Sequence, residues 1–323
     1  MELKVAIKQL IGADIEITHF NISEEDSLVT VALEGTETAL ENEKALKRDI
    51  VKVIKIDYGY TGARLSVDIK KKAPVRSNQT KYITVTSGKG GVGKSTVSAN
   101  LAACLAKFGH KVGIIDADIY GASVPKVFGM NDPELMLDEN DKIIPPVSEE
   151  GVMVMSVSFL LENDEPLMLR GPMLGRMLDH LFDDVAWPED TDYIIVDLPP
   201  GTGDVPLFLK DLIPEAKALV VTTPNQMASE IAIKSGEMAK KLGHELLGVV
   251  ENMSYYINPE SGNHDKIFGS GGGLIVADRL ETQLLAEISI AQVKEEQTRG
   301  IFTSHEENGL LYLGLANKVM KLV

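Results

Sequence analysis

The chain has 323 residues, of which 44% are hydrophobic and 25% are charged, and 32 basic residues stand against 48 acidic ones for a formal net charge of −16. This composition is typical of a folded globular protein and excludes a disordered or collagen-like chain. The acidic balance argues against nucleic acid as a partner, although it leaves room for a local basic patch.

Two further features limit the class of protein. The most apolar run, residues 152–161, is interrupted by Ser156 and Ser158 and is about half as long as the roughly 20 residues that cross a bilayer. Because the chain also opens without a basic start and an apolar core, we expect a cytoplasmic protein with no membrane partner. Its single cysteine, Cys104, excludes an intrachain disulfide and a metal site built from the cysteines of one chain.

Residues 1–72 are predicted to form a small α+β domain. Alternating apolar residues predict half-buried strands around residues 15–17, 29–33 and 63–69. Between them, apolar residues at helical spacing predict one helix that packs on an antiparallel sheet: Ala39, Leu46, Ile50 and Val53. The polar residues 73–80 are predicted to be a linker.

Residues 81–323 show short apolar runs separated by segments of helix length. Continuous apolar strands between helices predict a parallel sheet covered on both faces. We therefore expect an α/β fold with a mostly parallel, doubly wound sheet, in which ligands bind at the carboxyl ends of the strands. The predicted strands are residues 82–86, 112–115, 152–157, 193–196, 218–222 and 247–250.

The segment after the first of these strands, Ser87-Gly-Lys-Gly-Gly-Val-Gly-Lys-Ser-Thr96, matches the phosphate-binding pattern G-x-x-x-x-G-K-[ST]. Its glycines let consecutive backbone N–H groups converge on phosphate oxygens at the start of a helix. We expect Lys94 to reach the β- and γ-phosphates of ATP and the Ser95 hydroxyl to ligate Mg²⁺. The predicted nucleotide-binding residues are Gly88, Lys89, Gly90, Gly91, Val92, Gly93, Lys94, Ser95 and Thr96.

Acidic residues follow two more predicted strands. Asp116 and Asp118 follow one strand, and Asp197 follows another. Two carboxylates at positions i and i+2 beside a triphosphate suit the coordination of metal and water, and an apolar run before Asp197 is typical of a Walker B strand. We expect Ser95, Asp116 and Asp197 to hold Mg²⁺, partly through water, and Asp118 to be catalytic. Residues 198–204 are expected to form a switch loop that senses the γ-phosphate.

Together these motifs resemble the Mrp/ApbC family of P-loop ATPases, which are relatives of the Nbp35-type cluster scaffolds. Lys89 makes the loop a deviant Walker A motif, similar to that of the partition and septum-placement ATPases and of the nitrogenase iron protein. The match spans about residues 80–300, and residues 1–72 resemble the small MIP18-like domain that often precedes it. The other matching motifs are Asp116-Ala-Asp-Ile-Tyr-Gly, Arg170-Gly-Pro-Met, Asp197-Leu-Pro-Pro-Gly-Thr-Gly-Asp, Glu251-Asn-Met-Ser and Phe268-Gly-Ser-Gly-Gly-Gly.

The resemblance implies an ATP-hydrolysing homodimer with a family role in the assembly or transfer of iron–sulfur clusters. Its implied partners are iron–sulfur apo-proteins or scaffold proteins. It further implies that Lys89 reaches the phosphates of the partner subunit, that Asp118 is the switch I acid and that Asn252 contacts the adenine. From the residues alone, a solvated loop lysine is the alternative for Lys89. A charge supplied by a second subunit would couple hydrolysis to assembly.

The sequence departs from the family at the cluster ligands. Family members carry Cys-Pro-x-Cys-Gly shortly after Asn-Met-Ser, and alignment of the proline and glycine places Asn258 and Ser261 at the two cysteines. Neither side chain supplies the thiolate that iron–sulfur ligation requires, so no cluster is expected there. Cys104 lies among apolar residues of a predicted helix and is expected to be a buried small hydrophobe. The alternative function is an ATP-gated regulator or adaptor, directed at protein or DNA, that uses no cluster.

Overall fold

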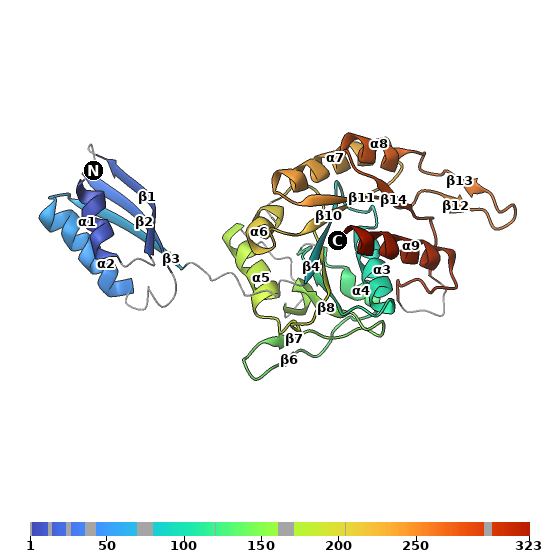
Figure 1. Cartoon of the computed structure of the whole chain (residues 1–323), viewed down its shortest axis with the longest axis horizontal. Coiled ribbons are helices and arrows are strands. Elements are labelled where there is room, and N and C mark those ends of the chain that lie inside the picture. Colours follow the sequence, from blue (N-terminus) through green and yellow to red (C-terminus); the bar gives the residue numbers. More distant parts are fainter. Residues whose placement is uncertain are drawn as a thin grey trace. The chain divides into compact units, whose positions relative to one another are not determined.

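The computed structural model of the chain describes residues 2–11, 15–23, 27–35, 43–69, 80–119, 121–160, 171–203, 205–293 and 299–323. The chain divides into two compact units, Met1–Val75 and Arg76–Val323 (Figure 1). Of the predicted linker at residues 73–80, all but Thr80 lies outside the described residues.

The first unit is an α+β fold with a three-stranded sheet. Strand β2 lies between β1 and β3, antiparallel to β1 and parallel to β3. Buried side chains of both helices and of β2 share one core, which includes Ile7, Ile50 and Val31. The elements are α1 (Glu2–Leu10), β1 (Ile15–Ser23), β2 (Leu28–Gly35), α2 (Glu43–Lys52), a π-helical turn (Val53–Asp57) and β3 (Gly62–Ile69).

Two expectations for this unit were wrong. The sheet is mixed and not antiparallel, because the α2 segment carries the chain back to the starting end of the sheet, so that β3 runs parallel to β2. Helix α1 was not predicted, although Leu3 and Ile7 are buried at a spacing of four residues. The predicted central helix is confirmed at Leu46 and Ile50 of α2, whereas Ala39 lies outside the described residues. The likeness to a MIP18-like domain stays a prediction.

The second unit contains seven parallel strands in the order β14-β11-β10-β4-β9-β5-β8. The mostly parallel sheet is confirmed, and the six predicted strands agree with the observed ones to within two residues at each end. The edge strand β14 was missed because only Leu285 of its four residues is buried. The strands are β4 (Lys81–Ser87), β5 (Val112–Asp116), β8 (Met153–Ser156), β9 (Tyr193–Asp197), β10 (Lys217–Thr222), β11 (Glu245–Glu251) and β14 (Leu284–Glu287).

Helices cover both faces of this sheet, which is the doubly wound arrangement. One core lies between the sheet and α3, α4 and α9, and it includes Val85, Leu101 and Leu315. On the opposite face α5 and α6 pack around Val196, and α7 and α8 pack around Val249. The helices are α3 (Lys94–Lys107), α4 (Val124–Phe128), α5 (Gly171–Asp183), α6 (Val205–Leu212), α7 (Gln226–Lys241), α8 (Gly272–Arg279) and α9 (Glu307–Leu322), with a 3₁₀ helix at Val157–Leu160.

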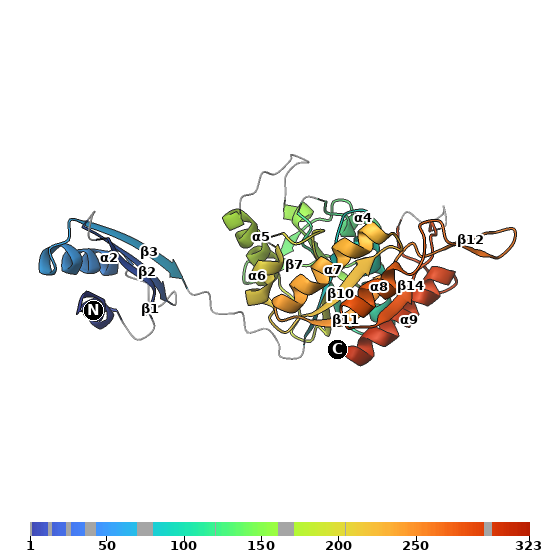
Figure 2. The same cartoon turned by 90° about the horizontal axis from the view of Figure 1, so that it is seen from above.

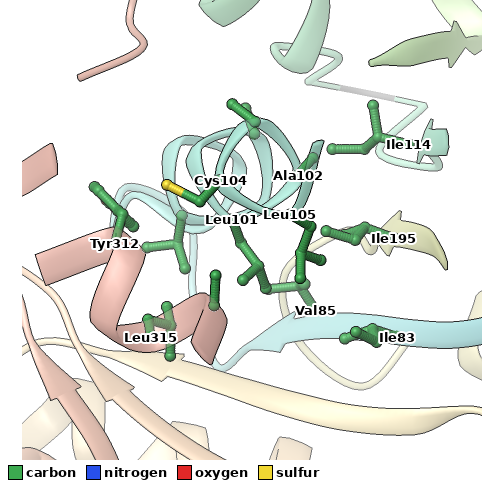
Figure 3. Packing of buried hydrophobic residues seen from close by; sticks show 14 of the residues in the cluster. Ile83, Val85, Leu101, Ala102, Cys104, Leu105, Ile114, Ile195, Tyr312 and Leu315 are labelled. Carbon is green, nitrogen blue, oxygen red and sulfur yellow. The ribbon is translucent and has the colours of Figure 1, made fainter. Parts of the chain in front are cut away.

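Cys104 belongs to the first of these cores. Figure 3 shows its side chain on α3, toward Tyr312 of α9. The residue is 7% exposed, and burial raises the pKa of its thiol to about 11. The prediction of a buried small hydrophobe is therefore confirmed by the burial of this side chain. A thiol that stays protonated is also a poor nucleophile and a poor metal ligand.

Two short hairpins complete the second unit: β6 (Met136–Leu137) with β7 (Ile143–Ile144), and β12 (Tyr256–Ile257) with β13 (His264–Asp265). The β12–β13 hairpin projects from the body of this unit in both Figure 1 and Figure 2. Among the described helices, none is long and apolar enough to cross a membrane.

Candidate active site

The loop between β4 and α3 forms one wall of a cavity of about 670 Å³. Gly91 and Gly93 have φ angles of +80° and +81°, which glycine adopts without strain. Because α3 begins at Lys94, the free N–H groups of its first turn face this loop. The residues that line the cavity are Ser87, Lys89, Gly90, Gly91, Val92, Gly93, Lys94, Ser95, Thr96, Asp118, Gly121, Ser123, Pro199, Pro200, Gly203 and Val205.

Asp197, at the end of β9, accepts hydrogen bonds from three side chains of α3. Lys94 Nζ and Ser95 Oγ each lie 2.6 Å from its Oδ2, and Ser98 Oγ lies 2.6 Å from its Oδ1. The carboxylate is fully buried and Lys94 is only 6% exposed. The structure thus brings together three of the predicted residues, Lys94, Ser95 and Asp197, and adds Ser98.

Asp116 and Asp118 occupy different environments. Asp116 is fully buried, and its carboxylate accepts hydrogen bonds from the backbone N–H groups of Asp118, Ser123 and Val124 at 2.9–3.1 Å. Burial, and secondly the carboxylate of Asp197, raise the pKa of Asp116 to about 7 despite these donors. Asp118 instead lines the cavity. Asp118 therefore borders the space that a ligand would occupy, whereas Asp116 holds the turn that leads into α4, and its predicted role in holding Mg²⁺ stays a prediction.

Asn252 lies behind the phosphate loop and, among the described residues, is not part of the cavity lining. Its side-chain Nδ2 donates to the Val92 carbonyl oxygen at 2.9 Å. Gly93 has no room for a side chain, because a Cβ there would overlap that Nδ2 atom. The structure shows Asn252 bracing the loop, and its contact with adenine stays a prediction.

Glu251 explains two of the sequence motifs in structural terms. Its fully buried carboxylate accepts a hydrogen bond from Ser254 Oγ through Oε1 and from the Gly273 N–H through Oε2, both at 2.5 Å. Gly273 belongs to the first turn of α8, where a carboxylate is stabilised by the helix dipole. A hydrogen bond therefore joins the Glu251-Asn-Met-Ser turn to the glycine-rich segment after Phe268.

The β12–β13 hairpin holds the residues that align with the missing cysteines. Asn258 Oδ1 accepts hydrogen bonds from the N–H groups of Glu260 and Ser261 at 3.0 and 3.2 Å, and Ser261 Oγ accepts one from Asn263 at 3.3 Å. These are bonds that close a tight turn. Beside the hairpin Tyr255 is buried and stacks on His264, with ring centroids 4.2 Å apart.

The structure describes some of the remaining predicted residues and not others. Lys89 is exposed at the cavity and, among the described residues, no carboxylate pairs with its ammonium group. Pro199 and Pro200 of the predicted switch loop line the cavity. Tyr120, Arg170 and Asp204, which belong to the matching motifs, lie outside the described residues.

Ser98 and Glu251 are the residues that sequence reasoning missed. The signal for Ser98 was its spacing, because Lys94 and Ser98 at positions i and i+4 of one helix lie on the same face. For Glu251 the signal was an acid at the end of an apolar strand, as at Asp116 and Asp197. Its partner Gly273 lies 22 residues further along the chain, and no local sequence pattern indicates that the two residues are in contact.

In this parallel sheet one strand leads through a glycine-rich loop into a helix, and the neighbouring strand ends in a buried aspartate. These two features define a P-loop NTPase. Residues 78–320 match the ParA family described as NUBPL iron-transfer P-loop NTPases. The chain belongs to this family, and the resemblance to Mrp/ApbC-type proteins is confirmed. The family match begins after the first unit.

Curated relatives agree with this assignment. The chain is 44% identical over 253 residues to an iron–sulfur cluster carrier protein of Bacillus subtilis (strain 168), in a match that covers 77% of this chain and 71% of the relative. It is 41% identical over 228 residues to an iron–sulfur cluster carrier protein of Pseudomonas fragi, covering 70% of this chain and 79% of the relative.

Solved structures with the same fold include nucleotide complexes. A nucleotide-binding protein of Archaeoglobus fulgidus in complex with ADP superposes with a TM-score of 0.58 at 33% identity, over 76% of this chain and 90% of that one. The septum site-determining protein MinD of Pyrococcus horikoshii OT3, complexed with Mg-ADP, superposes with a TM-score of 0.55 at 25% identity, over 75% of this chain and 97% of that one.

Proposed function

We propose that this chain is a Mg²⁺-dependent ATP hydrolase that acts in iron–sulfur cluster transfer without holding a cluster on its own β12–β13 hairpin. One observation carries the proposal: Lys94 and Ser95 meet at the buried carboxylate of Asp197, beside a cavity of about 670 Å³. A cavity of this size accommodates a nucleotide. The ADP and Mg-ADP complexes of two proteins of the same fold support the choice of nucleotide.

Ser95, which lines the cavity, and Asp197, which it contacts, form a donor set that suits Mg²⁺. Ser95 and Asp197 offer hydroxyl and carboxylate oxygens, and Mg²⁺ commonly uses one or two such groups together with water and substrate phosphates. Ser95 and Asp197 would hold the ion, and bound Mg²⁺ would supply positive charge that offsets the negative charge of the phosphates. Within this arrangement the backbone N–H groups of residues 90–95 hold the phosphates, and Lys94 neutralises the charge on the terminal phosphates. Asp118 orients the attacking water from the cavity wall.

We further propose that the active form is a homodimer in which Lys89 acts on the nucleotide of the partner subunit. The exposed position of Lys89 at the cavity mouth supports this role, because a long cation there is free to contact a second chain. A charge that arrives only with the partner would restrict hydrolysis to the assembled dimer. We also propose a cytoplasmic location for this homodimer.

The cluster is cargo in this proposal, and the hairpin does not fit it. Iron–sulfur clusters are held by thiolates, whereas the side-chain oxygens of Asn258 and Ser261 accept the hydrogen bonds that close the turn. The names of the curated relatives support cluster transfer as the family role. The chain would then act on a protein that brings its own cluster ligands. An ATP-gated regulator or adaptor, the alternative, would leave cluster transfer unchanged when its gene is deleted.

Anaerobic reconstitution with iron and sulfide tests the hairpin. After desalting, the parent chain is expected to remain colourless while hydrolysing ATP only when Mg²⁺ is present. The double variant N258C/S261C is expected to turn brown and to retain roughly two or more irons per dimer, because two chains then offer four thiolates. The matched variant N258A/S261A, which adds no thiol, should stay colourless. A parent chain that keeps its colour would contradict the proposal.

A further inference from the structure

Ser98 makes two contacts from the second turn of α3. Its hydroxyl lies 2.6 Å from Asp197 Oδ1 and 3.1 Å from the carbonyl oxygen of Lys94, one helical turn earlier. A hydroxyl has one hydrogen to donate, and a short bond to a carboxylate is the stronger of the two choices. The residue is fully buried and, among the described residues, is not part of the cavity lining. Ser98 therefore acts on Asp197 and not on a ligand in the cavity.

The three donors to Asp197 divide into two kinds. Lys94 and Ser95 share Oδ2, and the function proposed above assigns both of them to a phosphate and a metal ion. Among these three donors only Ser98 contacts Oδ1, and Ser98 is not part of the cavity lining. It is thus the donor that keeps its bond when the other two turn to the ligand. A buried carboxylate that loses all its donors carries a large desolvation cost.

We propose that Ser98 is a positioning residue that fixes Asp197 through Oδ1 and so turns Oδ2 toward the metal. The inference rests on the proposed function of this cavity and adds to it a residue that sets metal affinity. Groups that orient a metal-binding carboxylate in this way typically contribute tenfold or more to metal affinity. Ser98 should have little influence on how tightly the nucleotide binds without metal, because the loop amides and Lys94 carry that interaction.

The chain offers a matched control for the structural contribution of a helical serine. Ser229 on α7 is also buried, at 1% exposure, and its hydroxyl likewise lies close to the carbonyl oxygen four residues earlier, 3.2 Å from that of Asn225. Ser229 has no carboxylate among its described partners. A comparison of Ser98→Ala with Ser229→Ala therefore separates the bond to Asp197 from the general effect of removing a buried hydroxyl.

The experiment measures two affinities in the full chain. Binding of a fluorescent ATP analogue in excess EDTA gives the metal-free nucleotide affinity, and Mn²⁺ titration followed by electron paramagnetic resonance gives the metal affinity of the nucleotide complex. Ser98→Ala is expected to lower Mn²⁺ affinity about tenfold or more and to leave EDTA-state nucleotide affinity within about twofold. Ser98→Thr, which keeps the hydroxyl, should restore Mn²⁺ affinity, and Ser229→Ala should not change it.

Ser98→Cys replaces the hydroxyl by a weaker donor of similar size, so it tests the same bond if the alanine variant does not fold. It should weaken Mn²⁺ binding while Ser98→Thr does not. Unchanged Mn²⁺ affinity in Ser98→Ala or Ser98→Cys overturns the inference and leaves the proposed function standing. Equal losses in Ser98→Ala and Ser229→Ala also overturn it. A parent chain that binds no ATP analogue overturns the proposed function together with the inference.

Discussion

Gly93→Ala is expected to reduce the affinity of the chain for MgATP by about thirtyfold to a few thousandfold. A side chain at this φ of +81° costs about 1–2 kcal/mol, and the added Cβ would overlap the Asn252 amide nitrogen. Asn252 cannot turn away without breaking its 2.9 Å bond to the Val92 carbonyl oxygen, which costs about 1–3 kcal/mol more. Together these costs come to about 2–5 kcal/mol, and each 1.4 kcal/mol corresponds to a tenfold change in affinity.

Gly91→Ala provides the control for this variant. Gly91 has nearly the same φ of +80°, but nothing lies within 4 Å of the position that a Cβ would take. We therefore expect only the conformational cost, or about a tenfold loss of affinity. Equilibrium titration with a fluorescent ATP analogue measures both variants, and circular dichroism checks that both fold. Equal affinities in the two variants would show that the contact with Asn252 does not shape the loop.

Asp118→Ala is expected to lower the rate of ATP hydrolysis by about a hundredfold to a thousandfold while MgATP affinity stays within about threefold. Asp118 lines the cavity, and the proposed function assigns it to orient water at the γ-phosphate. Phosphate binding itself depends on the loop amides and Lys94, which the substitution leaves in place. Single-turnover phosphate release, measured beside equilibrium binding, separates the two effects.

Asp116→Ala is the comparison for Asp118→Ala. Asp116 is fully buried and satisfies three backbone N–H groups of the following turn, so its loss should lower the melting temperature. Asp118→Ala should melt within a few degrees of the parent, because its side chain is only half-buried at the cavity. Hydrolysis at the parent rate in Asp118→Ala would rule out its catalytic role. Unchanged stability in Asp116→Ala would contradict the structural role given to that residue.

The sequence predicted the second unit well because its central strands are buried on both faces. Such strands are continuous apolar runs, as in β5 and β9, and they stand out from the helices between them. Strand β14 lies at the sheet edge with one buried residue, so its pattern is too weak to distinguish from a loop. In the first unit, strand direction depends on how the chain crosses the sheet, and alternation within strands carries no such information.

The site residues could be predicted where they belong to one loop or follow directly after one strand. The glycines, Lys94 and Ser95 lie within one loop, and Asp197 ends an apolar strand, so the meeting of these groups at one sheet edge could be expected. The contact of Asn252 with Val92 and the bond of Glu251 to Gly273 join segments 160 and 22 residues apart. Their distances are fixed by tertiary packing, which no local pattern encodes.

Amide hydrogen exchange of the full chain, with and without MgATP, tests most directly whether the loop between β4 and α3 holds the triphosphate. Backbone N–H groups that donate to phosphate oxygens exchange more slowly, so MgATP should protect residues 88–97 more strongly than any other described segment. Exchange in residues 88–97 that MgATP leaves unchanged, or protection confined to another part of the chain, would contradict the assignment of this cavity as the ATP site.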